Sequence, residues 1–417
     1  MTRRIAPLRI LIVGLNYAPE AVGIGPYTAG LAEALAARGN RVEAVVGKPY
    51  YPQWRVNPAF AAAGWLRSTQ AGVTVTRCPH YVPREPTGLR RIIHLASFAL
   101  AALPPALRAA LRPRAERPEI VICIAPALLS IGTAWLAARL AGVKLWIHLQ
   151  DFEVEAALAT GLLDPGSFSA RLARWVEARI LALADRVSTI SPQMCDKLTD
   201  KGIARDRVLE LRNWSDARFS PDPAGAAAIR VEWGLGPRQV ALYSGNIARK
   251  QGIEILVEAA GLLGHRKDLV FIICGEGPNR AELARLATGL DNIQLHDLQP
   301  AARMGAMLTM ASVHLLPQIA SAADLVLPSK LTNMLASGRP VIATTEPGTG
   351  LYDEVHGCGA VSPPGDGPAL AAAIEALVDD PARRAVLGEA ASRRAAERWA
   401  KDAIIDRFAI ELGRLVR

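Results

Sequence analysis

A short apolar segment that ends near a glycine and precedes a helical pattern recurs along this chain, and this recurrence limits the possible folds more than any other feature. RILIVGL at 9–15 begins a first series of such segments, and QVALYSG at 239–245 begins a second. Continuous apolar runs of this length are typical of parallel strands buried on both faces and joined by helices. The pattern therefore predicts an α/β fold with doubly wound parallel sheets.

The two series indicate two domains. Further apolar segments lie at 42–47, 74–78, 119–126, 143–151 and 187–191 in the first series and at 269–278, 292–298, 312–318 and 339–345 in the second. A polar, proline-containing stretch at 213–225 separates them, and 417 residues exceed what one hydrophobic core usually covers. We predict an N-terminal Rossmann-like domain over 1–213 and a C-terminal one over 214–399.

Positive charge is concentrated in the first half of the chain. Residues 1–213 hold 27 Lys and Arg against 16 Asp and Glu, a balance of +11, whereas the other 204 residues hold 21 against 23, a balance of −2. A basic half can face nucleic acid, an anionic membrane or a phosphorylated substrate. The region has few aromatic residues and no recognition motif, which argues against nucleic acid as the partner.

The cysteines and the N-terminus indicate a cytoplasmic protein. The five cysteines are widely scattered, and none has the CxxC spacing of a zinc or redox site, so we expect buried free thiols and no bound metal. The apolar run near the N-terminus continues into a strand-and-loop pattern without a small-residue cleavage site. We therefore expect no signal peptide.

The segment 90–114 is apolar and flanked by arginines. Its apolar part of about 16 residues is interrupted by Pro104 and Pro105, and about 20 are needed to span a bilayer. Two interpretations stay open: a helix that lies in the interface of an anionic membrane, or a core helix of the first domain with solvated arginines at its ends.

Loops after the strands carry the candidate functional residues, because ligands of doubly wound sheets bind at the carboxyl ends of strands. The first such loop contains Asn16 and Tyr17 and ends in Gly23 and Gly25, just before a helix whose free N–H groups attract an anion. The loop lacks the full GxGxxG spacing, so a dinucleotide site is not indicated. Ordinary turn glycines are the alternative.

A second group of ionisable residues lies at the end of the strand predicted at 143–151. His148 and Asp151 lie in the run IHLQDFE, where a carboxylate or an imidazole could deprotonate a substrate hydroxyl. We favour Asp151 because it comes just past the strand, whereas His148 could equally be a core histidine with satisfied hydrogen bonds.

Three loops in the second half favour a phosphorylated ligand. Arg249 and Lys250 stand beside a predicted helix N-terminus, GEGP at 275–278 forms a tight turn with one carboxylate, and Ser329 and Lys330 open another helix. Cations and helix N-termini reinforce each other around a diphosphate. Each feature alone is also explained by helix capping.

These motifs resemble those of glycosyltransferase family 4, in particular the subgroup that acts in colanic-acid-type exopolysaccharide assembly. The resemblance covers nearly the whole chain and rests on these segments: NYAPEAVGIGPYTAGLAEALAARG, GNIARKQGIEILVEAA, GEGP, PSKLTNMLASGRPVIAT and CGAVSPPGDGPALAAAI. It implies the GT-B fold, in which two Rossmann-like domains face a central cleft. It further implies sugar transfer with retention and without a metal, and no Asp-x-Asp sequence occurs in the chain.

The resemblance also implies roles for the two domains and their residues. The second domain would bind a UDP- or GDP-linked sugar, and the first would bind a lipid-linked or oligosaccharide acceptor at the inner face of the plasma membrane, with a final helix at about 400–417 packing back on it. The sugar would be a hexose, fucose-type hexoses included. The implied donor contacts are Gly245, Asn246, Arg249, Lys250, Glu276, Ser329, Lys330 and Asn333.

The chain departs from the family pattern at several donor positions. Asn246 and Gln251 stand where the family commonly has Arg and Lys. The family's paired glutamates align with Leu325 and Asn333, and Asp324 lies beside the first of these positions. The departures leave the identity of the donor sugar open. Two other functions stay open: a nucleotide-sugar 2-epimerase of the same fold, and a non-catalytic protein that binds membranes or nucleic acid.

Overall fold

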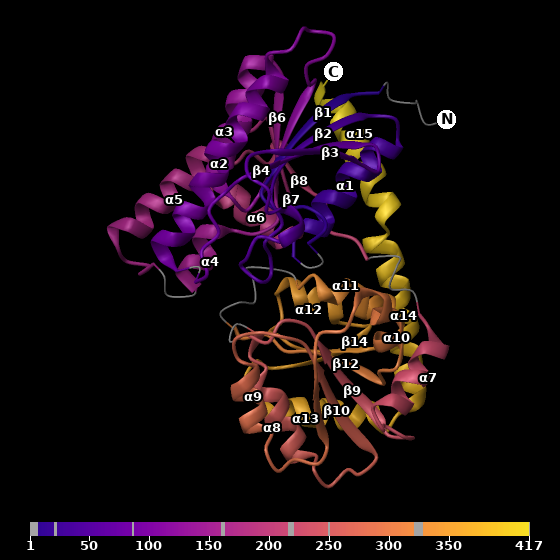
Figure 1. Ribbon diagram of the computed structural model, residues 1–417. Helices are drawn as coiled ribbons and strands as arrows, with labels where there is room; N and C mark the ends of the chain where they lie inside the picture. The colour runs from indigo at the N-terminus through magenta and orange to yellow at the C-terminus, as the bar shows by residue number, and fades with distance from the viewer. Residues whose placement is uncertain are drawn as a thin grey trace. The chain divides into compact units, whose positions relative to one another are not determined.

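The computed structural model describes residues 7–20, 23–85, 87–159, 163–215, 221–248, 251–320 and 328–416, and the chain divides into two compact units. Unit 1 comprises Met1–Arg212 and Asp402–Arg417, and unit 2 comprises Asn213–Lys401. Each unit is a mainly parallel sheet with helices on both faces (Figure 1). The prediction of two doubly wound α/β domains is confirmed.

The sheet of unit 1 has the strand order β3-β4-β2-β1-β5-β6-β7-β8. Its neighbouring strands are parallel, apart from the edge strand β3, which is antiparallel to β4. The strands are β1 (Arg9–Gly14), β2 (Arg41–Gly47), β3 (Leu66–Gln70), β4 (Val73–Cys78), β5 (Ile120–Ala125), β6 (Lys144–Leu149), β7 (Arg186–Thr189) and β8 (Val208–Glu210). The central strands β1 and β5 are almost fully buried, as their continuous apolar runs predict.

Helices cover both faces of this sheet. They are α1 (Gly25–Ala37), α2 (Gly88–Ala110), α3 (Leu128–Ala141), α4 (Glu153–Ala159), α5 (Phe168–Leu181), α6 (Pro192–Asp200) and α15 (Lys401–Val416). On one face, the ring of Phe408 in α15 stacks on Trp146 of β6 at 4.7 Å between ring centroids, and Asp406 accepts from Arg38 at the end of α1. On the other face, α2, α3 and α6 contribute to one hydrophobic core cluster with the strands.

Helix α2 is continuous through Pro104 and Pro105, which the sequence suggested would interrupt it. Pro105 has no N–H to donate to the carbonyl of Ala101, four residues earlier. The indole Nε1 of Trp65 donates to that carbonyl instead, at 2.8 Å. A donor from outside the helix thus replaces one backbone hydrogen bond lost to proline.

The length and composition of α2 would allow it to cross a membrane, in contrast to the expectation that its apolar part is too short. However, one side of the helix is buried, including His94, Phe98, Ala102 and Ala106, and it packs against α3. The buried side fits the interpretation of 90–114 as a core helix, and the exposed apolar side, with Ile92, Ile93 and Leu100, fits the interfacial interpretation.

The sheet of unit 2 is entirely parallel in its described residues, with the order β11-β10-β9-β12-β13-β14. Its strands are β9 (Gln239–Ser244), β10 (Leu269–Cys274), β11 (Ile293–His296), β12 (Val313–Leu316), β13 (Val341–Thr344) and β14 (Gly359–Ser362). Its helices are α7 (Pro223–Glu232), α8 (Glu254–Leu262), α9 (Arg280–Leu286), α10 (Met304–Thr309), α11 (Lys330–Ala336), α12 (Gly350–Val355), α13 (Gly367–Val378) and α14 (Pro381–Trp399). Core clusters lie on both faces of the central strand β9.

Candidate functional site

The loop after β1 is held by a buried carboxylate that sequence reasoning missed. Glu20 is 5% exposed, and its Oε1 accepts the backbone N–H groups of Tyr50 and Tyr51 at 3.0 and 3.1 Å. Its Oε2 accepts from the amide of Asn16 at 2.9 Å. Burial raises the pKa of Glu20, and these hydrogen bonds oppose the rise. Glu20 thereby joins the loop after β1 to the loop after β2.

The predicted glycines of this loop have different surroundings. Gly23 is exposed and has a φ of 74°, which favours glycine. Gly25, at the start of α1, is buried, and a Cβ built there would lie 2.9 Å from Cβ of Glu20 and 3.2 Å from the carbonyl oxygen of Tyr17. Gly25 is therefore needed for close packing on Glu20, besides any role of the helix N-terminus in binding an anion.

A buried arginine of β4 donates a hydrogen bond to the same loop. Arg77, at the end of β4, is 1% exposed, and it donates to the carbonyl of Ala18 and to the side chain of Gln70. Its guanidinium also lies 5.7 Å from the ring centroid of Tyr17, which is itself buried. Burial lowers the pKa of Arg77. In the sequence, the only sign of this role was the presence of an arginine in the otherwise strand-like segment TVTRC.

His148 lies inside β6, and Asp151 lies beyond the end of that strand. His148 is a residue of the strand itself, is 6% exposed, and has both ring nitrogens in hydrogen bonds, Nδ1 with Ser188 Oγ and Nε2 with Gln150 Nε2, each at 2.9 Å. Burial lowers the pKa of His148 to about 4, so the imidazole is neutral near pH 7. Asp151 lies beyond the strand and is half-buried. This geometry favours Asp151 as the candidate base.

The segment that carries Asp151 is anchored by a buried ionic cluster. Lys201, at the end of α6, donates to Glu155 of α4 and to Glu177 of α5, and Glu177 is fully buried. The Lys201 ammonium also lies 5.3 Å from the ring centroid of Phe152, the residue after Asp151. Three helices therefore fix the turn in which the candidate base lies.

In unit 2, the loops after β9 and β10 lie in close contact. The N–H of Ile247 donates to the carbonyl of Glu276 at 2.8 Å, and the N–H of Gly245 donates to Cys274 at 2.9 Å. A Cβ on Gly275 would lie 1.9 Å from the carbonyl oxygen of Gly245, so a side chain at 275 would not fit. The glycines predicted in these loops thus permit the two backbones to approach each other.

Lys330 reaches this pair of loops from the first residue of α11. Its Nζ lies 4.0 Å from the ring centroid of Tyr243 and 3.3 Å from the position that a Cβ of Gly245 would occupy. Tyr243 is buried, and its hydroxyl donates to the carbonyl of Asn246 at 2.7 Å. The structure therefore places a lysine ammonium beside Gly245 at the carboxyl end of β9.

The other predicted donor residues lie around this point or outside the described residues. Ser329 and the side chain of Glu276 are exposed, Asn246 is exposed, and Asn333 is half-buried one turn along α11 from Lys330. The carboxylate of Glu276 lies 3.9 Å from Nε of Arg280. Arg249, Lys250, Asp324 and Leu325 lie outside the described residues.

Comparison with known proteins decides the family of this chain. Residues 22–214 match a glycosyl transferase 4-like domain, and residues 238–380 match the glycosyl transferases group 1. The putative colanic acid biosynthesis glycosyl transferase WcaI of Escherichia coli K12 is 40% identical over 351 residues, which cover 82% of this chain and 85% of WcaI. The chain belongs to glycosyltransferase family 4.

Solved structures of glycosyltransferases share the fold of this family 4 member. Sucrose-phosphate synthase from Thermosynechococcus elongatus aligns with a TM-score of 0.75 and 20% identity, covering 98% of this chain and 99% of that protein. HepE of Anabaena, solved in complex with UDP, aligns with a TM-score of 0.71 and 16% identity, covering 98% of this chain and all of HepE. The GT-B fold implied by the sequence motifs is confirmed, and the chain is a glycosyltransferase.

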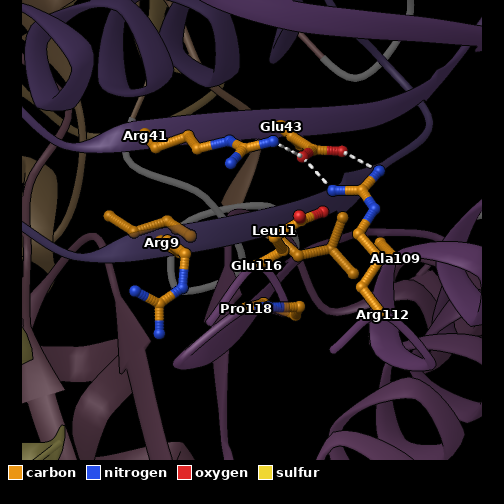
Figure 2. Close-up of a pocket in the computed structure, with 9 residues that line it drawn as sticks. Arg9, Leu11, Arg41, Glu43, Ala109, Arg112, Glu116 and Pro118 are labelled. Carbon is orange, nitrogen blue, oxygen red and sulfur yellow. Dashed lines mark hydrogen bonds and ion pairs between the residues drawn. The ribbon is translucent and has the colours of Figure 1, made fainter. Parts of the chain in front are cut away.

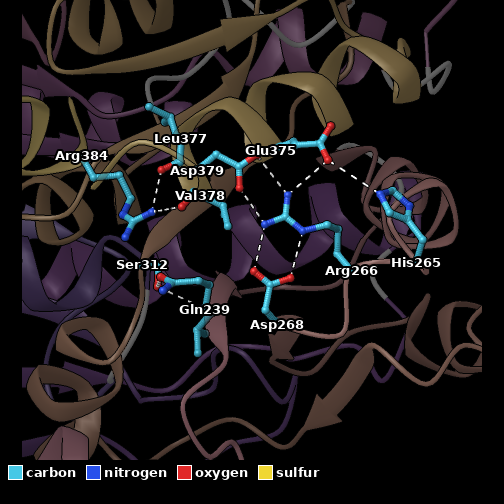
Figure 3. Close-up of polar contacts among 11 residues, drawn as sticks. Gln239, His265, Arg266, Asp268, Ser312, Glu375, Leu377, Val378, Asp379 and Arg384 are labelled. Carbon is cyan, nitrogen blue, oxygen red and sulfur yellow. Dashed lines mark hydrogen bonds and ion pairs between the residues drawn. The ribbon is translucent and has the colours of Figure 1, made fainter. Parts of the chain in front are cut away.

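Two polar clusters of the glycosyltransferase lie away from these loops. Figure 2 shows a small pocket at the amino ends of β1 and β2. There Arg112 makes a bidentate ion pair with Glu43. Figure 3 shows Arg266, just before β10, with Asp268 on one side and Asp379, at the end of α13, on the other. Both clusters lie at the amino ends of strands, so they connect structural elements at the edge opposite the functional loops.

No group of three or more His, Cys, Asp and Glu side chains with the geometry to hold a metal ion occurs among the residues that the structure describes. The five cysteines are buried free thiols, as the sequence predicts.

Proposed function

We propose that this glycosyltransferase moves a hexose, fucose-type hexoses included, from a UDP- or GDP-linked donor to a lipid-linked or oligosaccharide acceptor in exopolysaccharide biosynthesis. The observation that carries the proposal is the ammonium of Lys330 beside Gly245, where two glycine loops meet at the carboxyl end of β9. A cation next to closely approaching glycine backbone suits a diphosphate. The name of WcaI and the UDP bound to HepE support the same chemistry.

The proposed reaction retains the anomeric configuration and uses no metal or other cofactor. The bond between the sugar C1 and the diphosphate oxygen breaks, and its electron pair stays on the diphosphate. The acceptor hydroxyl forms the new C1–O bond on the same face of the sugar, and Asp151 accepts the hydroxyl proton. Lys330 stabilises the negative charge that develops on the leaving diphosphate, the role that a metal ion has in other transferases.

The proposal assigns the donor to unit 2 and the acceptor to unit 1. The loop of Asn16, Tyr17, Gly23 and Gly25 belongs to the acceptor side, and the balance of +11 over 1–213 suits an acceptor with phosphate groups at an anionic membrane. We therefore propose a cytoplasmic enzyme in peripheral contact with the inner face of the plasma membrane.

A panel of nucleotides tests the donor assignment. Thermal unfolding of the full chain is measured with UDP, GDP, ADP and their sugar conjugates, and either UDP or GDP is expected to raise the Tm because a ligand that binds only the folded state stabilises it. The absence of a shift with every nucleotide at millimolar concentration would refute the proposal.

Lys330→Gln tests the residue that carries the argument. The substitution removes a charged partner of the diphosphate, so we expect the nucleotide Kd to rise by roughly 10- to 100-fold, from about 1.5–3 kcal/mol for a charge-assisted hydrogen bond. Lys267→Gln is the matched control, since Lys267 is exposed just before β10, at the opposite end of the strands. Equal affinities for the two variants would contradict the role of Lys330.

An incubation without acceptor separates the transferase from the 2-epimerase. A transferase does not convert the sugar of the donor into an isomer. It consumes the nucleotide sugar only when an acceptor is added. Conversion of the free donor to a second nucleotide sugar would show the epimerase instead. Steeply salt-dependent binding to vesicles or nucleic acid with no turnover of any nucleotide sugar would show the non-catalytic alternative.

A further inference from the structure

Helix α5 of unit 1 carries large apolar side chains on the side that faces away from its core. Its inner side is buried through Ala170, Glu177 and Leu181. The residues of its outer side are apolar and exposed: Phe168 (71%), Leu172 (46%), Trp175 (57%) and Val176 (37%). With 3.6 residues per turn, these four positions fall on one arc of the helix, opposite Glu177.

The exposed charged residues of α5 are all arginines. Arg171, Arg174 and Arg179 are exposed on the helix, and its carboxylate, Glu177, is buried and paired with Lys201. The guanidinium of Arg179 lies 5.4 Å from the ring centroid of Trp175. Tryptophan and arginine together are typical of helices that lie at the boundary between lipid headgroups and acyl chains.

We propose that the outer face of α5, defined by Phe168, Leu172, Trp175 and Val176 with Arg171 and Arg179, docks on an anionic phospholipid surface. The apolar arc would enter the boundary of the acyl chains, and the arginines would contact the headgroup phosphates. The inference rests on the proposed function in one respect, because a lipid-linked acceptor requires the enzyme to work at a membrane.

The positive charge of the outer face of α5 favours a lipid surface over a second copy of the chain as its partner. In a symmetric dimer the same patch faces itself, so the arginines of one α5 would face those of the other without an exposed carboxylate on either helix. Such a contact is repulsive, whereas an anionic lipid surface offers a negative charge to each arginine, worth ~1 kcal/mol for each basic residue.

Helix α2 is the alternative membrane-binding element, because it contains the apolar segment 90–114. It also exposes apolar side chains, Ile92 and Ile93 among them, next to Arg90 and Arg91. Its opposite side packs against α3, which in turn contacts α5. A test of α5 must therefore include substitutions on α2 that are equally disruptive to an apolar surface.

Sedimentation of the full chain with vesicles tests the proposal. Binding is measured to phosphatidylcholine alone and to phosphatidylcholine mixed with phosphatidylglycerol, and stronger binding to the anionic vesicles is expected. Leu172→Ser combined with Trp175→Ser is expected to weaken this binding by more than about tenfold, because the buried apolar area is lost. Each of Arg171→Gln and Arg179→Gln is expected to weaken it by about fivefold, the equivalent of ~1 kcal/mol.

Matched variants make each result decisive. Val231→Ser, at an 83% exposed residue of α7 in unit 2, is expected to bind vesicles like the wild type. The proposal would be overturned if the double variant Ile92→Ser with Ile93→Ser lost binding while the α5 variant kept it. Equal binding of the wild type to neutral and anionic vesicles would also overturn it. Circular dichroism and the Tm show that each variant is folded. The nucleotide-induced shift is measured on the same variants and is expected to be unchanged, so failure of donor binding and failure of membrane docking are seen separately.

Discussion

Glu20 is a buried carboxylate whose oxygens accept from two backbone N–H groups and one side-chain amide across two loops. Glu20→Ala leaves the N–H groups of Tyr50 and Tyr51 without this acceptor, at a cost of about 1–3 kcal/mol for each buried group that stays unsatisfied. We expect a lower Tm and a higher KM for the acceptor. Steady-state kinetics with varied acceptor and thermal unfolding measure the two effects.

A matched acidic residue provides the control for this prediction. Glu116→Ala removes an exposed carboxylate of the same unit and is expected to change neither the Tm nor the acceptor KM. The nucleotide-induced rise in Tm should persist in Glu20→Ala, because the donor loops belong to unit 2. A variant with wild-type acceptor kinetics would show that Glu20 does not position the acceptor loop.

Buried histidines predict how stability depends on pH. Burial lowers the pKa of His148 and His80 to about 4 and that of His314 to about 3, from an ordinary value of 6.5. Between about pH 6.5 and pH 4 the unfolded chain therefore binds more protons than the folded one. The free energy of unfolding should fall as the pH falls through this interval, by up to about 1.4 kcal/mol per pH unit for each histidine.

His148→Gln isolates the contribution of one of these histidines. The variant is expected to be less stable than the wild type at pH 7, because Ser188 and Trp146 lose part of a buried hydrogen-bond network. Its free energy of unfolding should also depend less steeply on pH than that of the wild type. Urea unfolding at several pH values measures the slope, and the exposed His356→Gln is the control. An unchanged slope in His148→Gln would contradict the low pKa.

At the scale of secondary-structure elements, α2 shows how a helix continues through two prolines. Trp65→Phe removes the donor to the carbonyl of Ala101, and we expect a loss of about 1 kcal/mol, a typical net value for one hydrogen bond. Pro105→Ala restores an N–H that can donate to the same carbonyl. Trp65→Phe should therefore cost less in the Pro105→Ala background, and a double-mutant cycle of unfolding free energies measures the difference. Additive costs would show that the indole does not replace the missing donor.

Most strands could be predicted from the sequence, and the exceptions have a common cause. The buried strands of both sheets are continuous apolar runs, which local pattern reveals. β3 has no buried residue and is stabilised only by pairing with β4, while β8 and β14 are three and four residues long at sheet edges. Short or exposed edge strands depend on their neighbours, so their own sequence carries little signal.

The candidate site could be predicted as a set of loops but not as a set of contacts. Glycines and charged residues after apolar runs indicated the loops after β1, β6, β9 and β10. The pairing of Glu20 with Tyr50, 30 residues away, depends on the order of strands in the sheet, which puts β2 next to β1. The same holds for Lys330 and Gly245, which lie 85 positions apart. His148 shows the opposite difficulty, because its residue type suggests catalysis while its place inside β6 engages both ring nitrogens in hydrogen bonds.

At the scale of the whole molecule, the chain leaves unit 1 after Arg212, forms unit 2, and returns to unit 1 with α15. The return depends on apolar packing: Phe408 is 2% exposed and stacks on Trp146, which is fully buried beneath it. Ion pairs between Arg38 and α15 are largely exposed, so they contribute little by comparison. The C-terminal helix therefore completes the core of the N-terminal unit.

Phe408→Ala tests whether this packing stabilises unit 1 selectively. Removing a buried phenylalanine typically costs about 3–5 kcal/mol, and here the cost should fall on unit 1 because both stacked rings belong to it. Hydrogen exchange is expected to become faster in β6 and α1, whereas β9 and β10 keep their wild-type protection and the nucleotide still raises the Tm of unit 2. Val386→Ala, at a 65% exposed position of α14, is the control and should leave exchange unchanged. Equal acceleration of exchange in both units would mean that α15 stabilises the molecule as one cooperative body rather than completing the core of unit 1.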